Sequence, residues 1–78
     1  MKKKTFKMYV TRDDENRFHD EVACFSRKPT KCDGHWYNDS HLFDLDEKKF
    51  ARLFGFKLHH GEGPFEVEVT TRYEERKF

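Results

Sequence analysis

Residues 65–73 read Phe-Glu-Val-Glu-Val-Thr-Thr-Arg-Tyr, and this run is the clearest structural signal in the chain. Apolar or aromatic side chains alternate with charged or polar ones. Because successive side chains of a strand point to opposite faces, this period of two predicts a strand with one face buried. Residues 5–12 show the same alternation, with Phe6, Met8 and Val10 on one face. Two strands of this kind favour an antiparallel sheet.

Two further extended segments lie between these strands. Residues 22–26 (Val-Ala-Cys-Phe-Ser) are apolar on both faces, which predicts a central strand. Pro29 ends this strand, because proline cannot donate to the hydrogen-bond ladder. After a turn at residues 31–34, a third extended segment begins at His35 and runs, with an interruption, to Leu45.

A short helix is predicted between the third segment and the last strand. Three apolar side chains have the i, i+3, i+4 spacing of one helical stripe: Phe50, Leu53 and Phe54. Asp44 with Glu47, or Asp46 as a rival, would cap its start, and Gly55 would end it. The predicted fold is therefore α+β, a small antiparallel sheet of about four strands with one helix between strands 3 and 4 (β-β-β-α-β).

The composition limits the classes of protein to which the chain can belong. It has 78 residues, 40% of them charged, with a net charge of only +1. This length predicts a single domain over residues 1–78, with residues 1–4 as a flexible basic arm. A strongly polycationic nucleic-acid binder would carry a larger positive excess. Nine Phe, three Tyr and one Trp supply a core and argue against disorder.

No apolar run approaches the roughly 18 residues that a membrane span needs. The basic start Met1-Lys2-Lys3-Lys4 is not followed by an apolar stretch, so we expect no signal peptide. Together these features predict a cytoplasmic protein that does not contact a membrane.

Catalytic motifs are not apparent in the sequence. Ser26 and Ser40 do not lie in a nucleophile elbow, and no motif joins either one to a histidine. The glycine-rich segment at residues 61–64 lacks the lysine and following helix of a phosphate-binding loop. We therefore expect neither an enzyme nor a cofactor.

The two cysteines, Cys24 and Cys32, are expected to be free thiols, because a reducing compartment disfavours disulfides. Cys24 has the setting of a small core residue. A disulfide between them is one alternative. A metal site formed by Cys24, Cys32 and His35 is another, but the spacing of the two cysteines does not match a zinc knuckle, so no metal is expected.

Several short motifs are shared with a group of small proteins. They are Met8-Tyr9-Val10-Thr11-Arg12-Asp13, Lys28-Pro29, Gly34-x-Trp36, Leu45-Asp46, Leu53-Phe54 and Gly61-Glu62-Gly63-Pro64 leading into Glu66-Val67-Glu68-Val69. With these motifs the chain resembles small, mostly uncharacterised proteins encoded by phages and prophages. It departs from them after the first strand, where Asp14-Glu15-Asn16 and a longer polar insert replace an Asp-Gly hairpin.

The resemblance implies a phage or prophage origin but no particular activity. By analogy, small phage proteins of this type bind a host protein as inhibitors or adaptors, including anti-CRISPR and other anti-defence factors. The leading hypothesis is accordingly a non-enzymatic module that binds a protein in the cytoplasm of a bacterial host cell. Aromatic side chains dominate interface energetics, so we expect Tyr9, Trp36 and Tyr37 as anchors, with Asp39 and Asp44 steering the encounter.

The sequence is also consistent with two other modes of binding. The first is single-stranded nucleic acid, bound by a basic N-terminal arm (Lys2, Lys3, Lys4 and Lys7) together with aromatic side chains on the sheet. The second is a homodimer formed through an exposed edge strand.

Overall fold

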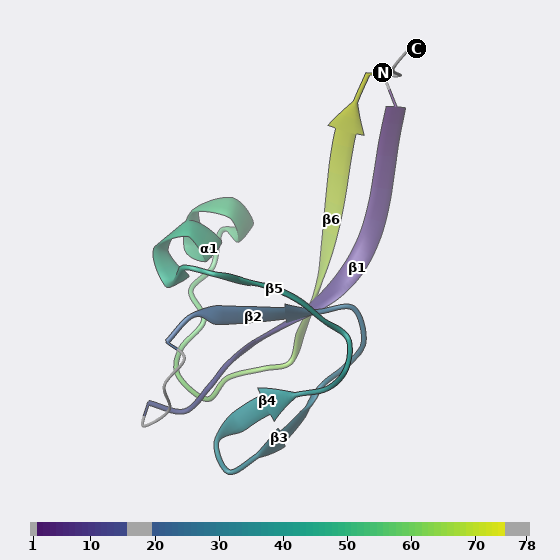
Figure 1. Cartoon of the computed structure of the whole chain (residues 1–78). Helices are drawn as coiled ribbons and strands as arrows, with labels where there is room; N and C mark the ends of the chain where they lie inside the picture. Colours follow the sequence, from purple (N-terminus) through teal and green to yellow (C-terminus); the bar gives the residue numbers. More distant parts are fainter. Residues whose placement is uncertain (1, 16–19, 75–78) are drawn as a thin grey trace.

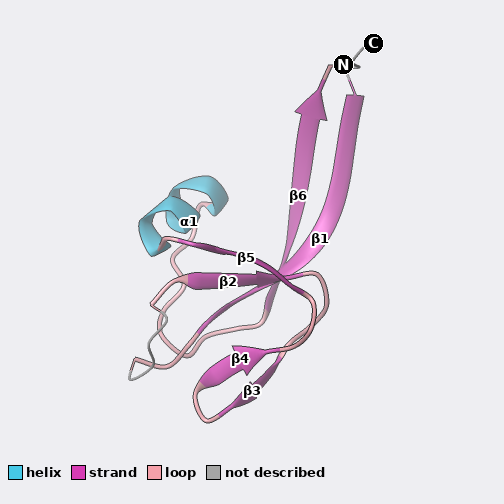
Figure 2. Cartoon of the chain, viewed as in Figure 1, coloured by secondary structure: helices cyan, strands magenta, loops and turns pink. Residues whose placement is uncertain are grey.

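The computed structural model describes residues 2–15 and 20–74 of the chain (Figure 1). Within these residues six strands and one helix follow one another. Figure 2 colours them by type. They are β1 (Lys2–Arg12), β2 (Val22–Phe25), β3 (Thr30–Cys32), β4 (His35–Tyr37), β5 (His41–Leu45), α1 (Glu47–Phe54) and β6 (Phe65–Tyr73). Four strands form an antiparallel sheet in the order β5-β2-β1-β6, and β3 pairs with β4 in a separate hairpin. The α+β class and the four-stranded sheet are confirmed.

The predicted order of elements was wrong, because α1 follows the fifth strand of the chain. Residues 31–34, which were predicted as a turn, include the end of an unpredicted strand, β3. Asp33 (φ 51°) and Gly34 (φ 77°) both adopt left-handed backbone, as a two-residue hairpin turn requires, and this turn joins β3 to β4. The predicted third segment is then divided at Ser40, whose backbone N–H donates to Asn38 Oδ1 (2.8 Å).

β1 and β6 pair along almost their whole length, from Lys2 opposite Tyr73 to Val10 opposite Phe65. β2 pairs only with the last four residues of β1, so the rest of β1 and its partner form a two-stranded ribbon. Figure 1 shows this ribbon projecting from the sheet, and the molecule measures 48 × 26 × 20 Å. Residues 2–4, expected in a flexible arm, belong to β1, because the strand-forming pattern of β6 continues to Tyr73 and supplies partners for them.

The core lies on the face of the sheet that α1 covers. Its buried members are Met8, Val10, Val22, Cys24, Phe50 and Leu58. The Phe50 ring stacks on Phe54 with centroids 4.8 Å apart and meets Phe56 edge-on at 5.2 Å. An aromatic cluster of this kind compensates for the small size of the core.

Both ends of α1 are capped by residues that the sequence indicates. The N-terminal cap is Asp46, the alternative to Asp44, and the C-terminal cap is Gly55. Asp46 Oδ1 accepts hydrogen bonds from the backbone N–H groups of Lys48 (2.9 Å) and Lys49 (3.2 Å). Gly55 closes the helix in the left-handed conformation (φ 80°). No helix among the described residues is long and apolar enough to cross a membrane.

Replacing Phe50, the buried ring of α1, tests whether this side chain holds the helix against the sheet. Phe50→Ala removes a fully buried ring, and we expect the free energy of unfolding to fall by about 3–5 kcal/mol. Leu53→Ala is the matched control on the same helix, because Leu53 is 65% exposed and should change stability by no more than about 0.5 kcal/mol. Urea denaturation followed by circular dichroism compares the two. Equal losses would contradict this description of the core.

The two thiols should differ in reactivity. Cys24 is buried, and burial followed by the charge of Asp44 raises its pKa from 9.0 to about 12, whereas Cys32 is exposed. An aromatic disulfide reagent at about pH 8 should therefore modify Cys32 at once and Cys24 only after denaturation. Because the folded state keeps the Cys24 proton that the unfolded chain releases near pH 9, this thiol should lower stability as the pH rises above 9 towards 12. Rapid modification of both thiols would contradict the assignment.

Candidate functional site

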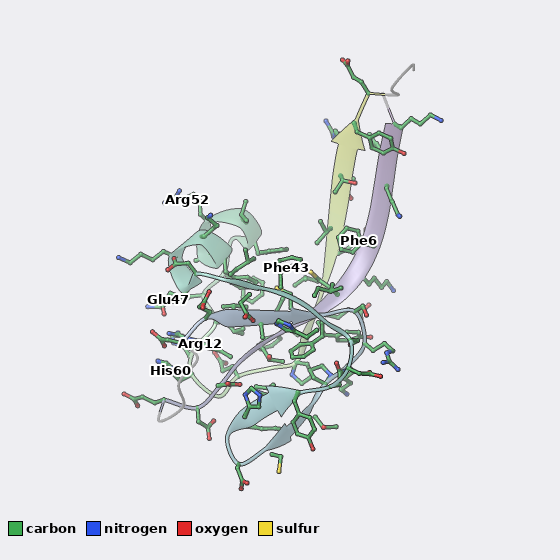
Figure 3. The ribbon with its side chains drawn as sticks, viewed as in Figure 1. Phe6, Arg12, Phe43, Glu47, Arg52 and His60 are labelled. Atoms are coloured by element: carbon green, nitrogen blue, oxygen red, sulfur yellow. The ribbon has the colours of Figure 1, made fainter. Side chains whose placement is uncertain are left out.

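Arg12, at the end of β1, is a buried cation that joins three parts of the chain. Its guanidinium is 4% exposed and forms ion pairs with Glu47 of α1 and with Asp20, the latter at 2.7 Å. Nη1 also donates to the backbone carbonyl of Leu58 (3.0 Å). Figure 3 shows Arg12 and Glu47 near each other, close to the start of α1. A buried guanidinium needs such partners, and here they tie the helix and two loops to β1.

The next residue, Asp13, is 5% exposed and holds the β3–β4 hairpin. Its Oδ2 lies 2.6 Å from His35 Nδ1, and its Oδ1 accepts the backbone N–H of Trp36 (2.9 Å). The indole N–H of Trp36 donates to the carbonyl oxygen of Arg12 (3.1 Å). The hairpin is thereby fixed against the end of β1.

Asp14 completes this attachment. Its backbone N–H donates to the carbonyl of Gly34 (2.8 Å), and its carboxylate pairs with Lys31 Nζ at 2.6 Å. A Cβ on Gly34 would stand 2.8 Å from Asp14 Oδ2, so glycine is needed for this close approach as well as for its backbone angle. The Lys31 ammonium also lies 5.6 Å from the centre of the Trp36 ring, a cation–π distance.

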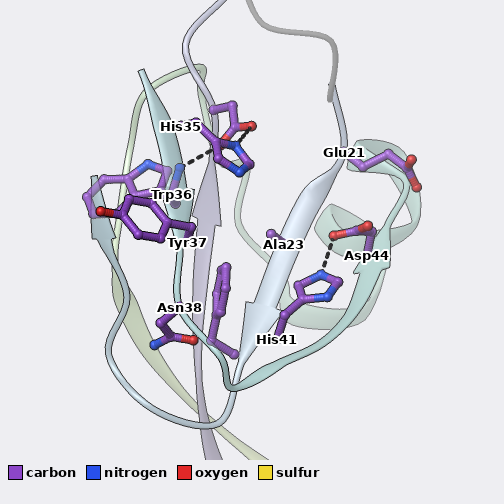
Figure 4. A pocket seen from close by; sticks show the side chains of 10 residues that line it. Glu21, Ala23, His35, Trp36, Tyr37, Asn38, His41 and Asp44 are labelled. Atoms are coloured by element: carbon purple, nitrogen blue, oxygen red, sulfur yellow. Dashed lines mark hydrogen bonds and ion pairs between the residues drawn. The ribbon is translucent and has the colours of Figure 1, made fainter. Parts of the chain in front are cut away.

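Docking of the hairpin forms a hollow of about 240 Å³ on the face of the sheet turned away from α1. β2 and β5 form one side of the hollow and β4 the other, as Figure 4 shows. Ten residues line it: Asp13, Glu21, Ala23, Phe25, His35, Trp36, Tyr37, Asn38, His41 and Asp44. Their carboxylates and aromatic rings make the hollow both acidic and aromatic.

The side chains of the hollow are arranged in pairs. His41 Nε2 lies 2.8 Å from Asp44 Oδ1, and the His41 ring meets Phe25 edge-on with centroids 5.3 Å apart. On the other side, the rings of His35 and Tyr37 stack 6.4 Å apart at 10°. Pairs of this kind favour one orientation of the rings and carboxylates.

The structure brings together three of the five predicted anchor and steering residues. Trp36, Tyr37 and Asp44 all line the hollow, with Trp36 half-buried and Tyr37 49% exposed. Asp39 lies outside it, exposed and paired with Arg27. Tyr9 is half-buried beside the hollow, opposite Phe25 in the sheet, but does not line it.

Sequence reasoning missed seven of the ten lining residues. The residues that it did not single out as part of a partner site are Asp13, Glu21, Ala23, Phe25, His35, Asn38 and His41. Asp13 reads as an ordinary turn residue, and its partner His35 is 22 positions away. A polar residue directly after an amphipathic strand is only weak evidence for a binding or structural role. The contacts of Asp13 with His35 and Trp36 become visible only in the tertiary structure.

Of the residues considered for a metal site, Cys24 lies apart from Cys32 and His35. Cys24 belongs to the core under α1, whereas Cys32 is exposed in β3, opposite His35. Among residues 2–15 and 20–74, no three His, Cys, Asp or Glu side chains come together as metal ligands. Both cysteines are free, as predicted.

The lysines considered for nucleic-acid binding are divided between the two faces of the ribbon. Lys2 and Lys4 share one face, while Lys3 and Lys7 share the other, since side chains of a strand alternate. Lys7 pairs with Glu66 at 3.2 Å, and this hydrogen bond and attraction raise the pKa of Lys7. These four residues therefore do not make one basic surface.

No family model, curated protein or solved structure matches this chain.

Removing the Asp13 carboxylate should release the hairpin. Asp13→Ala removes the carboxylate that accepts from the part-buried N–H of Trp36 and contacts the ring of His35, and we expect a loss of about 2–4 kcal/mol in unfolding free energy. Asp39→Ala is the control, because its pair with Arg27 is exposed and contributes at most about 1 kcal/mol. Urea titration followed by the fluorescence of Trp36, the single tryptophan, measures both. Similar small losses in the two variants would show that Asp13 does not hold the hairpin.

Proposed function

We propose that the protein is a non-enzymatic binding module whose hollow receives a lysine or arginine side chain of a partner protein. The observation that carries this proposal is the meeting of aromatic rings and carboxylates in one preformed hollow. Figure 4 shows Trp36 and Tyr37 on one side, with Glu21 and Asp44 on the other. A cation between them would face the π-system of the rings and the negative charge of the carboxylates.

The charge of the lining favours a cation over other ligands. Asp13, Glu21 and Asp44 bring three carboxylates, and the lining contains no lysine or arginine. Its basic side chains are two histidines, His35 beside Asp13 and His41 beside Asp44. Lys31 lies against Trp36 but is not part of the lining. The ring walls supply apolar contact for the methylene stem of a lysine or arginine, which buries its stem while its charged end meets the acids.

The same lining favours binding over catalysis. It includes no serine, threonine or cysteine that could act as a nucleophile beside its two histidines. The nearby hydroxyl of Ser40 is engaged with Asn38 Oδ1 (2.6 Å) and the carbonyl of Arg27 (3.3 Å). Asp13 orients the imidazole of His35 and Asp44 orients that of His41, and these contacts hold the two sides of the hollow in place.

The partner class follows from two further observations. Tyr37 is exposed at the edge of the hollow and provides the aromatic anchor that protein interfaces favour. By analogy with the small phage proteins that the sequence resembles, we propose a bacterial host protein as the partner, with inhibition or adaptation as the outcome of binding. Single-stranded nucleic acid has less support, because its four candidate lysines lie on opposite faces of the ribbon.

Peptide titration tests the proposal directly. Short peptides that differ only at one position, with lysine, arginine or uncharged norleucine, are titrated against the protein while Trp36 fluorescence is recorded. We expect saturable binding of the lysine and arginine peptides and about ten-fold weaker binding of the norleucine peptide. Asp44→Asn and Glu21→Gln should each weaken the charged peptides, whereas Lys28→Gln, on an exposed residue outside the hollow, should have no effect.

Two results would count against a cation pocket. The first is equal affinity for the norleucine and lysine peptides, because the carboxylates would then contribute nothing. The second is binding of an oligothymidine strand with no binding of any peptide, which would favour the nucleic-acid alternative.

A further inference from the structure

The outer edge of β6 is long and regular. β6 is the last strand in the order β5-β2-β1-β6, and it runs for nine residues without proline. One of its edges pairs with β1, and no strand among the described residues pairs with the other. An edge of this kind presents unpaired backbone groups to any strand of matching sequence.

We propose that two copies of the chain pair antiparallel through β6, with a two-fold axis at Val69. Val69 is the central residue of the nine, so this register uses the whole strand. Two four-stranded sheets then join into one continuous sheet, and each copy contributes the same surface, as an isologous contact requires.

The charged face of β6 is complementary to itself in this register. Glu66 of one copy lies opposite Arg72 of the other, and Glu68 lies opposite Thr70. Within one copy, Arg72 faces Lys3 across the β1–β6 ribbon, and two like charges directly opposite each other repel. A second copy would supply the carboxylate that Arg72 lacks opposite it.

The other face of β6 is complementary too. Phe65 lies opposite Tyr73 of the second copy, and these two rings are 43% and 51% exposed in one copy. At the axis Val69 meets its own counterpart, and Phe6, which is opposite Val69 in β1, extends the apolar strip on both sides. Aromatic and β-branched cross-strand pairs are among the most favourable in sheets.

Neighbouring registers and other edges fit less well. An axis at Glu68 would set that carboxylate against itself, and an axis at Thr70 would set Glu66 against Glu74. The open edge of β1 is rich in lysine, which is how natural edges avoid self-pairing. β6 combines length with charges of both signs, Glu66 and Glu68 near its start and Arg72 near its end.

β6 contributes no residue to the lining of the hollow, so dimerisation and cation binding can be tested independently. Charge reversal on β6 provides the test. Sedimentation equilibrium from about 1 μM to about 1 mM protein should show a monomer–dimer equilibrium for the unaltered chain. Glu66→Arg and Arg72→Glu should each weaken the dimer by about ten-fold or more, since each places like charges opposite one another at two symmetric positions.

Mixing the two variants in equal amounts provides the decisive measurement. In a mixed pair the two substituted side chains face each other with opposite signs, and so do the two native ones, so dimerisation should return to the level of the unaltered chain. Lys28→Glu is the matched control, an exposed charge reversal away from β6 that should leave the dimer unchanged. Circular dichroism of each variant confirms that it is folded.

Three results would overturn the proposal. The first is an unaltered chain that stays monomeric up to about 1 mM. The second is a dimer that neither single charge reversal weakens. The third is a mixture of the two variants that remains as weakly associated as each variant alone.

Discussion

The structure depends on two adjacent residues of opposite charge at the end of β1. Arg12 turns to the face of the sheet that carries α1, and Asp13 turns to the opposite face. One buried charge holds the helix and two loops, and the other holds the β3–β4 hairpin. Because buried charges are costly unless they are paired, this position tolerates little rearrangement. Both layers of the molecule are thus fixed from one point of the chain.

This arrangement explains how a chain with a small core maintains a preformed hollow. The apolar core lies under α1, while the hairpin that walls the hollow is attached by hydrogen bonds to Asp13 and Asp14. The aromatic rings of β4 can therefore remain partly exposed without weakening the core. The aromatic residues of the chain serve two purposes, packing on one face of the sheet and forming a surface on the other.

Local patterns predicted the α+β class, the four-stranded sheet and the helix, whereas the order of the elements and the site depend on distant contacts. The alternation in β6 and the stripe ending at Phe54 are visible within a few residues, so the strand and helix were predicted with nearly correct bounds. Nothing local to Asp13 reveals its contact with His35, and Asp33-Gly34 reads as a turn without showing that a strand precedes it. Trp36, Tyr37 and Asp44, which line the hollow, were predicted as partner contacts only because aromatic and acidic side chains are common at interfaces.

The pairing of Lys2 with Tyr73 places the two ends of the described chain next to each other at the tip of the ribbon. Both ends lie away from the hairpin and its hollow (Figure 1). A short linker could join them at little cost in loop-closure entropy. The fold is thus well suited to circular permutation, and to insertion as a unit into a surface loop of another protein.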